Sequence, residues 1–230
     1  MIKRVGIVQS NYIPWCGYFD LISQCDEFVF LDDVQYTKND WRNRNKIKTA
    51  IGAQWLTIPC GTNISRRIDQ VIVSDTNWAR KHWKTITQNY NKTRYFSEFE
   101  EVLKAFYWSW QSPTSLSAIN QTLITHISQE ILGLHCQFHS SRHLNVDGVR
   151  TARLAAMVQK LEGTHYISGP SAKSYLNFDI FREKKIDVIF AKYPRYGPYS
   201  QKGRAFIENL SILDAIFNLG YDVNNFFGCA

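Results

Sequence analysis

The chain opens with a pattern that predicts two parallel strands joined by a helix. An apolar, β-branched run over residues 4–8 leads into a polar loop, and residues 18–23 then carry apolar side chains at helical spacing. A second apolar run over residues 27–31 stops at a pair of aspartates. Such a unit implies a right-handed crossover, so we expect any ligand outside the carboxyl ends of the strands, where Asn11 and Asp32 both fall.

The rest of the chain predicts further strands and several amphipathic helices. Strands are expected over residues 55–59, 70–73, 165–167 and 187–191. Helices are expected over residues 78–90, 99–110, 116–134, 149–161 and 210–219, because each has apolar residues three and four apart. We therefore predict an α/β fold with a Rossmann-like parallel sheet, in a single domain of residues 1–230 with a helical insertion or lid at about residues 78–134.

Composition narrows the class of protein. Of 230 residues 44% are hydrophobic and 20% charged, so the chain can bury a core and is neither disordered nor fibrous. No window holds 18 apolar residues and the first residues do not form a signal peptide, so we expect a cytoplasmic protein without a membrane partner. Five scattered cysteines without a C-x-x-C pair predict reduced thiols and no metal site. A net charge of +7 favours an anionic partner.

The loop after the first strand is the first candidate site. A glycine that opens a helix after a strand lets backbone N–H groups approach a phosphate, and amide and ring side chains surround it here. The alternative is a turn whose aromatic residues only fill the gap between sheet and helix. The substrate-binding candidates in this loop are Asn11, Tyr12, Trp15 and Gly17.

The second candidate joins an acidic pair to a basic segment. Adjacent carboxylates at a strand end, Asp32 and Asp33, can act as a general base, accept a hydroxyl, bind a cation or simply cap the backbone. Residues 38–48 then hold five basic side chains against one acidic, and such a run can also be a solvated surface. Arginine forks suit phosphate, and the interleaved asparagines and tryptophan favour a site. The substrate-binding candidates here are Gln35, Tyr36, Lys38, Trp41, Arg42, Asn43 and Arg44.

Two further segments supply candidates. On the predicted helix 78–90, His82 could deprotonate an attacking amine, or it could be a partly exposed surface histidine; Tyr90 lies at the end of the same helix. The strand at residues 165–167 leads into a Ser and Gly turn with Ser171 as the expected helix cap and Lys173 in the first turn, a pattern typical of an anion cradle or of an ordinary capped helix. Its binding candidates are Ser168, Gly169, Ser171 and Lys173.

Several of these strings, in order, resemble the WbqC-like family of bacterial polysaccharide-locus proteins. The similarity rests on Asn11-Tyr12, Pro14-Trp15, residues 17–19, 31–36 and 41–45, Lys81-His82 through Tyr90, residues 168–176 and 211–214. The resemblance implies a product of an O-antigen or capsule cluster that modifies an activated sugar. It implies acylation of an amino sugar with glycine or another small acyl group.

A second resemblance concerns the fold. The strand, Pro-x-x-Gly loop, helix and strand are similar to the nucleotidyltransferase or HUP-like enzymes, including ligases that make amides through acyl adenylates. Trp15 and Tyr18 stand where those enzymes place two histidines. An already activated donor, such as an acyl thioester or an aminoacyl-tRNA, would remove the need for ATP.

These observations lead to one main hypothesis and two alternatives. The main hypothesis is a cytoplasmic enzyme that N-acylates a nucleotide-linked amino sugar, with dTDP as the expected nucleotide, ATP or an activated acyl donor as the co-reactant, and Asp33, Asp32 or His82 as catalytic residues. The first alternative is a non-catalytic partner that binds a nucleotide sugar or RNA. The second is a nucleotidyltransferase or glycosyltransferase that uses a divalent ion at the acidic pair.

Overall fold

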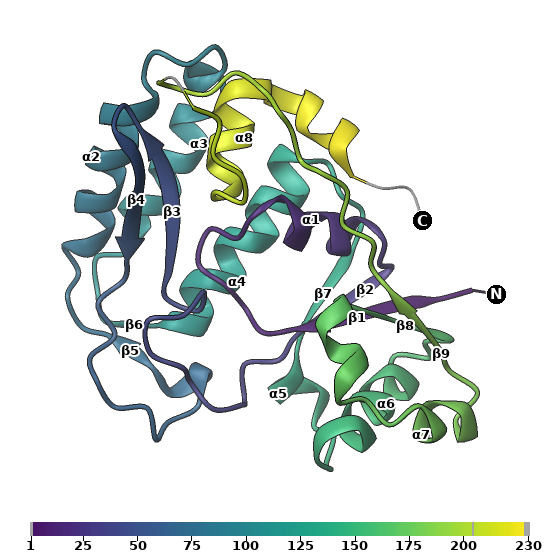
Figure 1. Cartoon of the computed structure of the whole chain (residues 1–230). Helices are drawn as coiled ribbons and strands as arrows, with labels where there is room; N and C mark the ends of the chain where they lie inside the picture. The colour runs from purple at the N-terminus through teal and green to yellow at the C-terminus, as the bar shows by residue number, and fades with distance from the viewer. Residues whose placement is uncertain (1, 204, 228–230) are drawn as a thin grey trace.

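The computed structural model describes residues 2–203 and 205–227, and its centre is a five-stranded parallel sheet (Figure 1). The strands lie in the order β7-β2-β1-β8-β9. Their bounds are Gln137–Ser140 for β7, Glu27–Phe30 for β2, Arg4–Val8 for β1, His165–Ser168 for β8 and Asp187–Phe190 for β9. In chain order the strands run 3-2-1-4-5, which is the order of a Rossmann-like fold and confirms the prediction.

The order in which successive strands are added to the sheet reverses beside β1. From β1 the chain passes through helix α1 (Cys16–Ser23) to β2 and later to β7, and then returns to β8 on the opposite side of β1. All four strand pairs are parallel, with Gly6 opposite both Phe28 and Ile167. Open sheets of this kind bind ligands at the point where the strand order reverses, outside the carboxyl ends of the strands. Here that point lies between the ends of β1 and β8.

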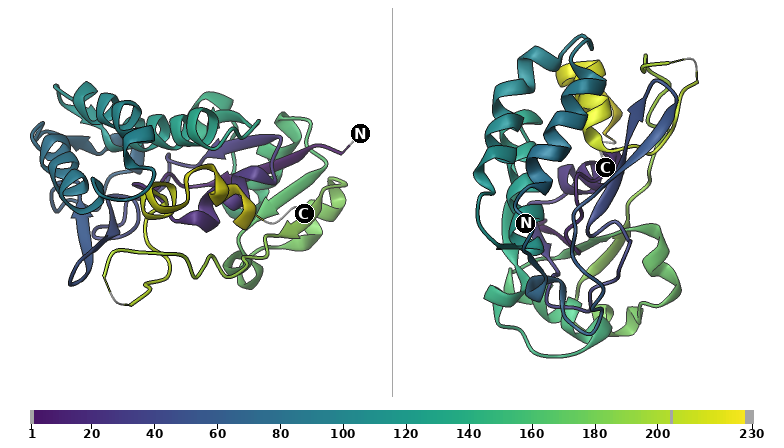
Figure 2. Two further views of the ribbon diagram at one scale, coloured as in Figure 1. Left: turned by 90° about the horizontal axis from the view of Figure 1, so that it is seen from above. Right: turned by 90° about the vertical axis from the view of Figure 1, so that its left-hand side faces the viewer.

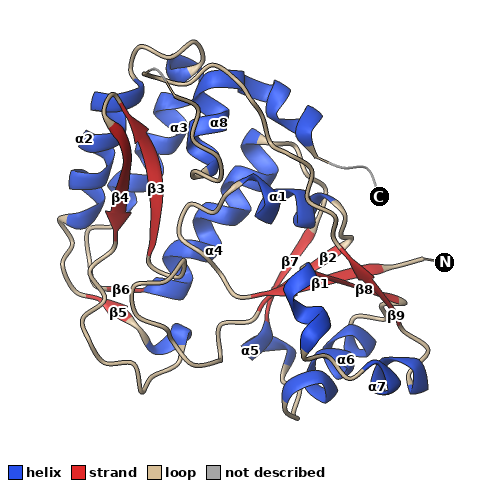
Figure 3. Ribbon diagram, viewed as in Figure 1, coloured by secondary structure: helices blue, strands red, loops and turns tan. Residues whose placement is uncertain are grey.

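The two faces of the sheet pack against different helices. Alternate residues of β1 face opposite sides, and Val5 and Ile7 belong to one apolar cluster with helix α6 (Arg150–Lys160) and helix α7 (Phe178–Glu183). On the other face, Phe28 and Phe30 join a larger cluster that contains α1. This cluster extends into the helical part of the molecule (Figure 3).

The chain between β2 and β7 forms a separate lobe on the larger cluster. Its hairpin pairs β3 (Arg44–Thr49) with β4 (Gly52–Thr57), and a short pair joins β5 (Ile72–Val73) to β6 (Thr114–Ser115). Helix α2 (Trp78–Tyr90), helix α3 (Phe96–Ser109) and helix α4 (Leu116–His126) follow the predicted helical segments closely. The C-terminal helix α8 (Ile212–Leu219) packs against both α3 and β3, beside the hairpin (Figure 2).

The remaining elements are short. Helix α5 (Ser141–Leu144) follows β7, and a π-helical turn (Ile127–Ile131) extends α4. Turns of 3₁₀ helix cover Ile68–Gln70, Pro170–Ser174 and Gly220–Phe226. In the described part of the chain, every helix is too short or too polar to cross a membrane.

Candidate functional site

The loop between β1 and α1 is held rigidly by segments that are distant in sequence. The Tyr12 amide donates to the Trp41 carbonyl (2.9 Å), and the Asn45 side chain donates to the Ile13 carbonyl (2.8 Å). From the C-terminal part, the Ile212 amide donates to the Pro14 carbonyl (2.8 Å). Ile13 is buried with a φ of 37°, a conformation that a β-branched residue adopts only when its surroundings impose it. Such imposed backbone strain is typical of functional loops.

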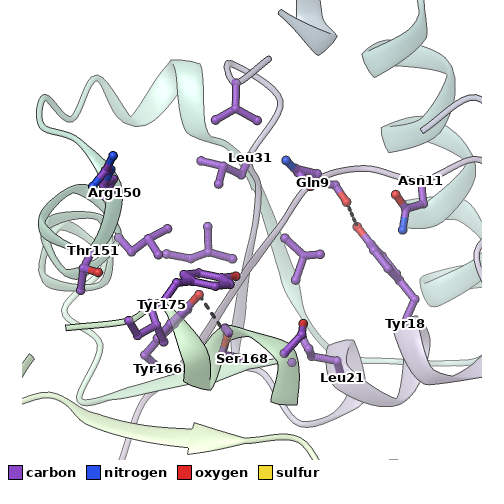
Figure 4. A pocket seen from close by; sticks show the side chains of 18 of the residues that line it. Gln9, Asn11, Tyr18, Leu21, Leu31, Arg150, Thr151, Tyr166, Ser168 and Tyr175 are labelled. Atoms are coloured by element: carbon purple, nitrogen blue, oxygen red, sulfur yellow. Dashed lines mark hydrogen bonds between the residues drawn. The ribbon is translucent and has the colours of Figure 1, made fainter. Parts of the chain in front are cut away.

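A cavity of about 650 Å³ lies at the predicted switch point (Figure 4). Its walls come from the carboxyl ends of β1 and β8, the loop after β1, the start of α6 and the turn after β8. The polar side chains in its lining are Gln9, Asn11, Arg42, Arg150, Thr151, Arg153, Ser168 and Ser171. Residues from four separate stretches of the sequence therefore meet at one edge of the sheet.

The charge in this cavity is entirely positive. Among the described residues that line it, the charged side chains are Arg42, Arg150 and Arg153, and none is a carboxylate or a histidine. Arg42 donates to the Asn11 amide oxygen, and its other contact, with Asp40, is 3.6 Å long. Arg150 has no ion pair with any described residue. Arg153 pairs with Asp33, so Arg150 and Arg42 are the guanidinium groups with the most free capacity to bind phosphate, and the cavity suits an anion.

Aromatic rings supply the other part of the lining. Tyr18 donates its hydroxyl to the Gln9 carbonyl (3.0 Å), and Tyr166 accepts from Ser168 (3.4 Å), so both rings are fixed at the cavity wall (Figure 4). Tyr175 is 70% exposed and also lines the cavity. Trp15 packs edge-on against Tyr193, with 5.2 Å between ring centroids. These rings offer surfaces on which a base or a sugar ring can pack.

The acidic pair does not act as one unit. Asp32 is buried and accepts hydrogen bonds from the Ser10 amide (2.8 Å) and the Gln121 side chain (2.8 Å), as well as from the Ser117 hydroxyl. Asp33 accepts from the Ser141 hydroxyl (2.6 Å) and from both terminal nitrogens of Arg153. Asp32 thus links the loop after β1 to α4, while Asp33 orients Arg153 at the cavity.

The protonation state of Asp33 follows from these contacts. Burial on its own raises the pKa of the Asp33 carboxyl, but the hydrogen bonds from Arg153 and Ser141 outweigh burial and hold the pKa below its usual value. Asp33 is therefore an anion at neutral pH that pairs with Arg153. Neither aspartate is among the residues that line the cavity.

His82 lies in a sealed polar cluster on the other side of the loop. Its Nδ1 is 2.8 Å from the Tyr12 hydroxyl, which is 2.9 Å from the Tyr107 hydroxyl, and all three side chains are buried. Burial lowers the pKa of His82 to about 4, despite a backbone hydrogen bond with Thr57. His82 and Tyr12 are therefore not brought to the cavity, although both were binding or catalytic candidates.

Several other candidates have structural partners instead of facing the cavity. Tyr90 donates to Asp214 (2.8 Å) and accepts from the Lys48 amide (2.8 Å), while Asn43 donates to the Ile58 carbonyl (2.9 Å). Tyr36 is buried. Gln35 and Lys38 are exposed and do not line the cavity.

Gly17 serves close packing, not phosphate approach. A Cβ added at this buried position would lie 2.4 Å from Cζ2 of the Trp15 ring. Glycine is therefore favoured because the indole covers it, and Gly17 is not among the residues that line the cavity. The expected role of this glycine in contacting phosphate is not supported by the geometry.

The turn after β8 meets the prediction in part. Ser168, Gly169 and Ser171 line the cavity, but the expected capped helix is a single 3₁₀ turn with Gly169 at its start and no side-chain cap at Ser171. Lys173 is exposed and outside the lining.

Eight polar or aromatic residues of the cavity lining were not among the candidates: Gln9, Tyr18, Arg150, Thr151, Arg153, Tyr166, Tyr175 and Tyr193. Arg150 and Arg153 lie in the first turn of α6, where a cation opposes the helix dipole. Arg150 and Arg153 share with Lys173 the first-turn position from which an anion site was predicted. The rings of Tyr175 and Tyr193 lie in segments without periodicity, which gave no signal.

A second cavity of about 310 Å³ adjoins the first. It is lined by Asn11, Pro14, Trp15, Trp41, Asn45 and Asn209. Asn11 and Trp15 belong to both cavities, so one amide and one indole separate the two spaces. The arrangement can hold two reactants on either side of Asn11.

Cys16, beside Trp15, is not a nucleophile in this arrangement. It is buried, and burial raises the pKa of its thiol to about 12. The four described cysteines, Cys16, Cys25, Cys60 and Cys136, are free thiols.

Comparison with known proteins finds matches along nearly the whole chain. A profile of the WbqC-like protein family matches residues 9–225. An uncharacterized protein of Mycobacterium tuberculosis, Rv1507c, is 40% identical over 227 residues, which cover 98% of this chain and 97% of that protein. No solved structure matches the chain. The matched span includes every polar residue that lines either cavity.

Proposed function

The chain belongs to the WbqC-like family, and we propose on that basis that it is a sugar-modifying enzyme of polysaccharide biosynthesis that N-acylates the amine of a nucleotide-linked amino sugar. One observation carries the proposal. A cavity at the switch point of the sheet combines three arginines with five aromatic rings and has no acidic group among its described lining residues. Arginines suit a diphosphate, and rings suit a base and a sugar.

The residues divide into groups that bind the parts of such a substrate. Arg42 and Arg150 bind the phosphates, and Arg153 is held at the cavity wall by its ion pair with Asp33. Tyr175 and Trp15 pack against the rings of the substrate. Asn11 lies at the boundary of the two cavities, where its amide can hold the sugar amine next to an acyl carbonyl.

The reaction needs positioning more than acid or base catalysis. The free amine attacks the acyl carbonyl, a C–N bond forms, and the bond from the carbonyl carbon to the sulfur or oxygen of an activated donor breaks. The leaving thiol or hydroxyl group carries the proton that the amine loses. Holding an amine and an activated carbonyl in contact supplies a large part of the rate enhancement without a protein base.

The direct test is product formation. The protein is incubated with a dTDP-linked amino sugar and, in separate arms, an acyl thioester, an aminoacyl-tRNA, or a free acid with ATP. The mass of the sugar nucleotide is then followed. We expect an increase equal to one acyl group in one arm, and loss of that product in Arg42→Ala. No acylated product in any arm would overturn the proposal.

A second function is favoured by one specific observation, the lack of a carboxylate or histidine among the described residues of the cavity lining. A non-catalytic protein that presents a nucleotide sugar to another enzyme needs only arginines and rings. In that case the dTDP-sugar binds with salt-dependent affinity and no donor gives a product.

Metal-assisted sugar or nucleotidyl transfer finds less support. It would use both carboxylates of the acidic pair, and these already accept hydrogen bonds from different partners, Asp32 toward α4 and Asp33 toward Arg153. Both would have to turn away from these partners to share one ion.

A further inference from the structure

An exposed cluster of rings and cations continues the second cavity over the β3–β4 hairpin. It consists of Trp41, Arg44, Lys46 and Trp55, which we call the hairpin patch. Trp41 and Trp55 are 43% and 40% exposed, and their ring centroids are 5.7 Å apart. The Arg44 guanidinium carbon and the Lys46 Nζ lie 4.3 Å and 4.9 Å from the centroid of the Trp55 ring.

The pairing of the hairpin explains why these groups meet. Arg44 and Lys46 are two residues apart on β3 and therefore project from the same face, and Lys46 lies directly opposite Trp55 on β4. Two large exposed tryptophans, one on the hairpin and one before it, and two cations of β3 are not required for its pairing. Their arrangement therefore suggests a ligand.

The positive charges of the patch are not neutralised by the protein. Neither Arg44 nor Lys46 has an ion pair with any carboxylate in the described residues, whereas Arg67, Arg182 and Arg195 each lie within 3.0 Å of one. Rings that hold two unpaired cations bind nucleotides, because a base stacks on the aromatic groups while the cations bind its phosphates.

The patch leads directly to the boundary between the cavities. Trp41 contacts Trp55 on the outside and lines the second cavity on the inside. Asn11 and Trp15 line the same cavity and also line the main cavity. A ligand on the patch can therefore extend through the second cavity to Asn11.

We propose that the hairpin patch and the second cavity bind the acyl donor, and that this donor carries its acyl group on a nucleotide. The base stacks on Trp41 and Trp55, its phosphates bind Arg44 and Lys46, and the acyl carbonyl reaches Asn11. This inference rests on the proposed function, since it assigns the second reactant of that transfer. The shared chemistry is an acylated nucleotide, which occurs both in a coenzyme A thioester and in the 3′-terminal ester of an aminoacyl-tRNA.

The step balances without a further reactant. The amine nitrogen of the sugar forms a bond to the acyl carbon, and the C–S bond of the thioester or the C–O bond of the ester breaks. The thiol of coenzyme A or the 3′-terminal hydroxyl of the RNA leaves with the proton from the amine.

Binding can be measured apart from turnover. The probes are coenzyme A and a short RNA that ends in CCA, neither of which carries an acyl group, and affinity is measured by calorimetry. We expect one of them to bind the wild-type protein, and Trp55→Ala to bind it about tenfold more weakly. The double variant Arg44→Ala/Lys46→Ala should bind more weakly still and with a smaller dependence on salt. The probe that binds identifies the source of the nucleotide.

The controls keep loss of folding separate from loss of the site. Trp108→Ala removes a tryptophan that is 39% exposed on α3 and lines neither cavity, so it should bind the probes as the wild type does. Trp55→Phe should retain most of the affinity, and melting temperatures check that each variant folds. Affinity for dTDP, measured for the main cavity, should not change in Trp55→Ala.

The outcomes separate this inference from the proposed function. Equal affinity of Trp55→Ala and Trp108→Ala for the bound probe, or no binding of either probe to the wild type, would overturn the donor site. If an acylated sugar forms but Trp55→Ala makes it at the wild-type rate, the transferase stands and the donor site is wrong. If the probe binds through Trp55 but no product forms, the nucleotide site stands and its role as acyl donor site is wrong.

Discussion

The loop between β1 and α1 has polar side chains on two sides. One side is sealed inside the protein, and the other faces a cavity. On one side, Tyr12, His82 and Tyr107 bond to one another in a sealed cluster. On the other, Asn11 and Arg42 bond to each other but face a cavity of about 650 Å³. Buried polar groups of the first side satisfy one another, while the guanidinium groups of the second retain unused donors. Function is expected where hydrogen-bonding capacity remains, and the following experiments test that distinction.

The largest expected effect is on the free energy of unfolding and comes from His82 on the sealed side. Burial lowers the folded-state pKa of His82 to about 4 from an ordinary value of 6.5. Below pH 6.5 the unfolded state therefore takes up a proton before the folded state does. The stabilising contribution is complete above pH 6.5 and is lost as the pH falls to about 4, a change of about 3 kcal/mol.

This effect is measured as the free energy of unfolding between pH 7 and pH 4. His82→Gln should flatten the profile in that range, and the same substitution at the exposed His143 controls for the loss of an imidazole as such. Affinity for dTDP at pH 7 should stay within twofold in a folded His82→Gln protein. A large loss of affinity would place His82 in the site and break the comparison.

The next effect belongs to the open side. Arg42→Ala removes a cation that can bind phosphate, and we expect affinity for dTDP to fall about 30-fold, as for the loss of one hydrogen bond to a charged group. Calorimetry measures the affinity, and Arg42→Lys should recover part of it. Since Arg42 is only partly buried, the melting temperature should change little. Unchanged affinity together with a large drop in melting temperature would make Arg42 a structural residue.

Asp33→Asn tests whether the acidic pair acts on the reaction or on an arginine. The amide keeps the shape of the side chain but removes the negative charge that orients Arg153. KM for the sugar nucleotide should therefore rise about fivefold, while kcat stays within threefold. A general base behaves differently, since its loss lowers kcat by about 10² to 10⁴. A fall of that size would restore Asp33 as a catalytic residue.

The smallest effect concerns Gly17, whose added methyl group would collide with Trp15. Gly17→Ala should shift the indole and weaken dTDP binding about threefold, because overpacking moves a ring at the cavity wall. The effect should largely vanish in a Trp15→Phe background, where the smaller ring leaves room. An equal loss in both backgrounds would show that Gly17 acts on the ligand directly.

The sequence predicted elements well where periodicity is strong. Helix α2 has the bounds that its apolar spacing predicts, and β1, β2, β8 and β9 match the apolar runs. Strand β3 was missed because it reads as a polar segment, although Lys48 within it is buried and donates to the Ala205 carbonyl (2.5 Å). Burial of a charged side chain depends on a distant partner, which no local pattern reveals.

The candidate site was likewise predictable from topology but not from local sequence patterns. Topology predicted Asn11 and Asp32 outside the carboxyl ends of the strands, and Asn11 lines the cavity there, whereas Asp32 accepts hydrogen bonds from Ser10 and from α4 instead. Side-chain direction within the loop could not be predicted, because residues 9–15 have neither helical nor strand periodicity. Tyr12 and Asn11 are adjacent in the chain, but the strained loop turns Tyr12 into the buried cluster and leaves Asn11 at the cavity.

The contacts between loop 9–15 and the C-terminal helix have a consequence for biosynthesis. Trp15 pairs with Ser211, the Ile212 amide bonds to the Pro14 carbonyl, and the Ser211 amide bonds to the Lys46 carbonyl. The loop emerges from the ribosome well before these partners do. A nascent chain therefore lacks both finished cavities until residues 211 and 212 have been made, and reactants can meet on the protein only after that point.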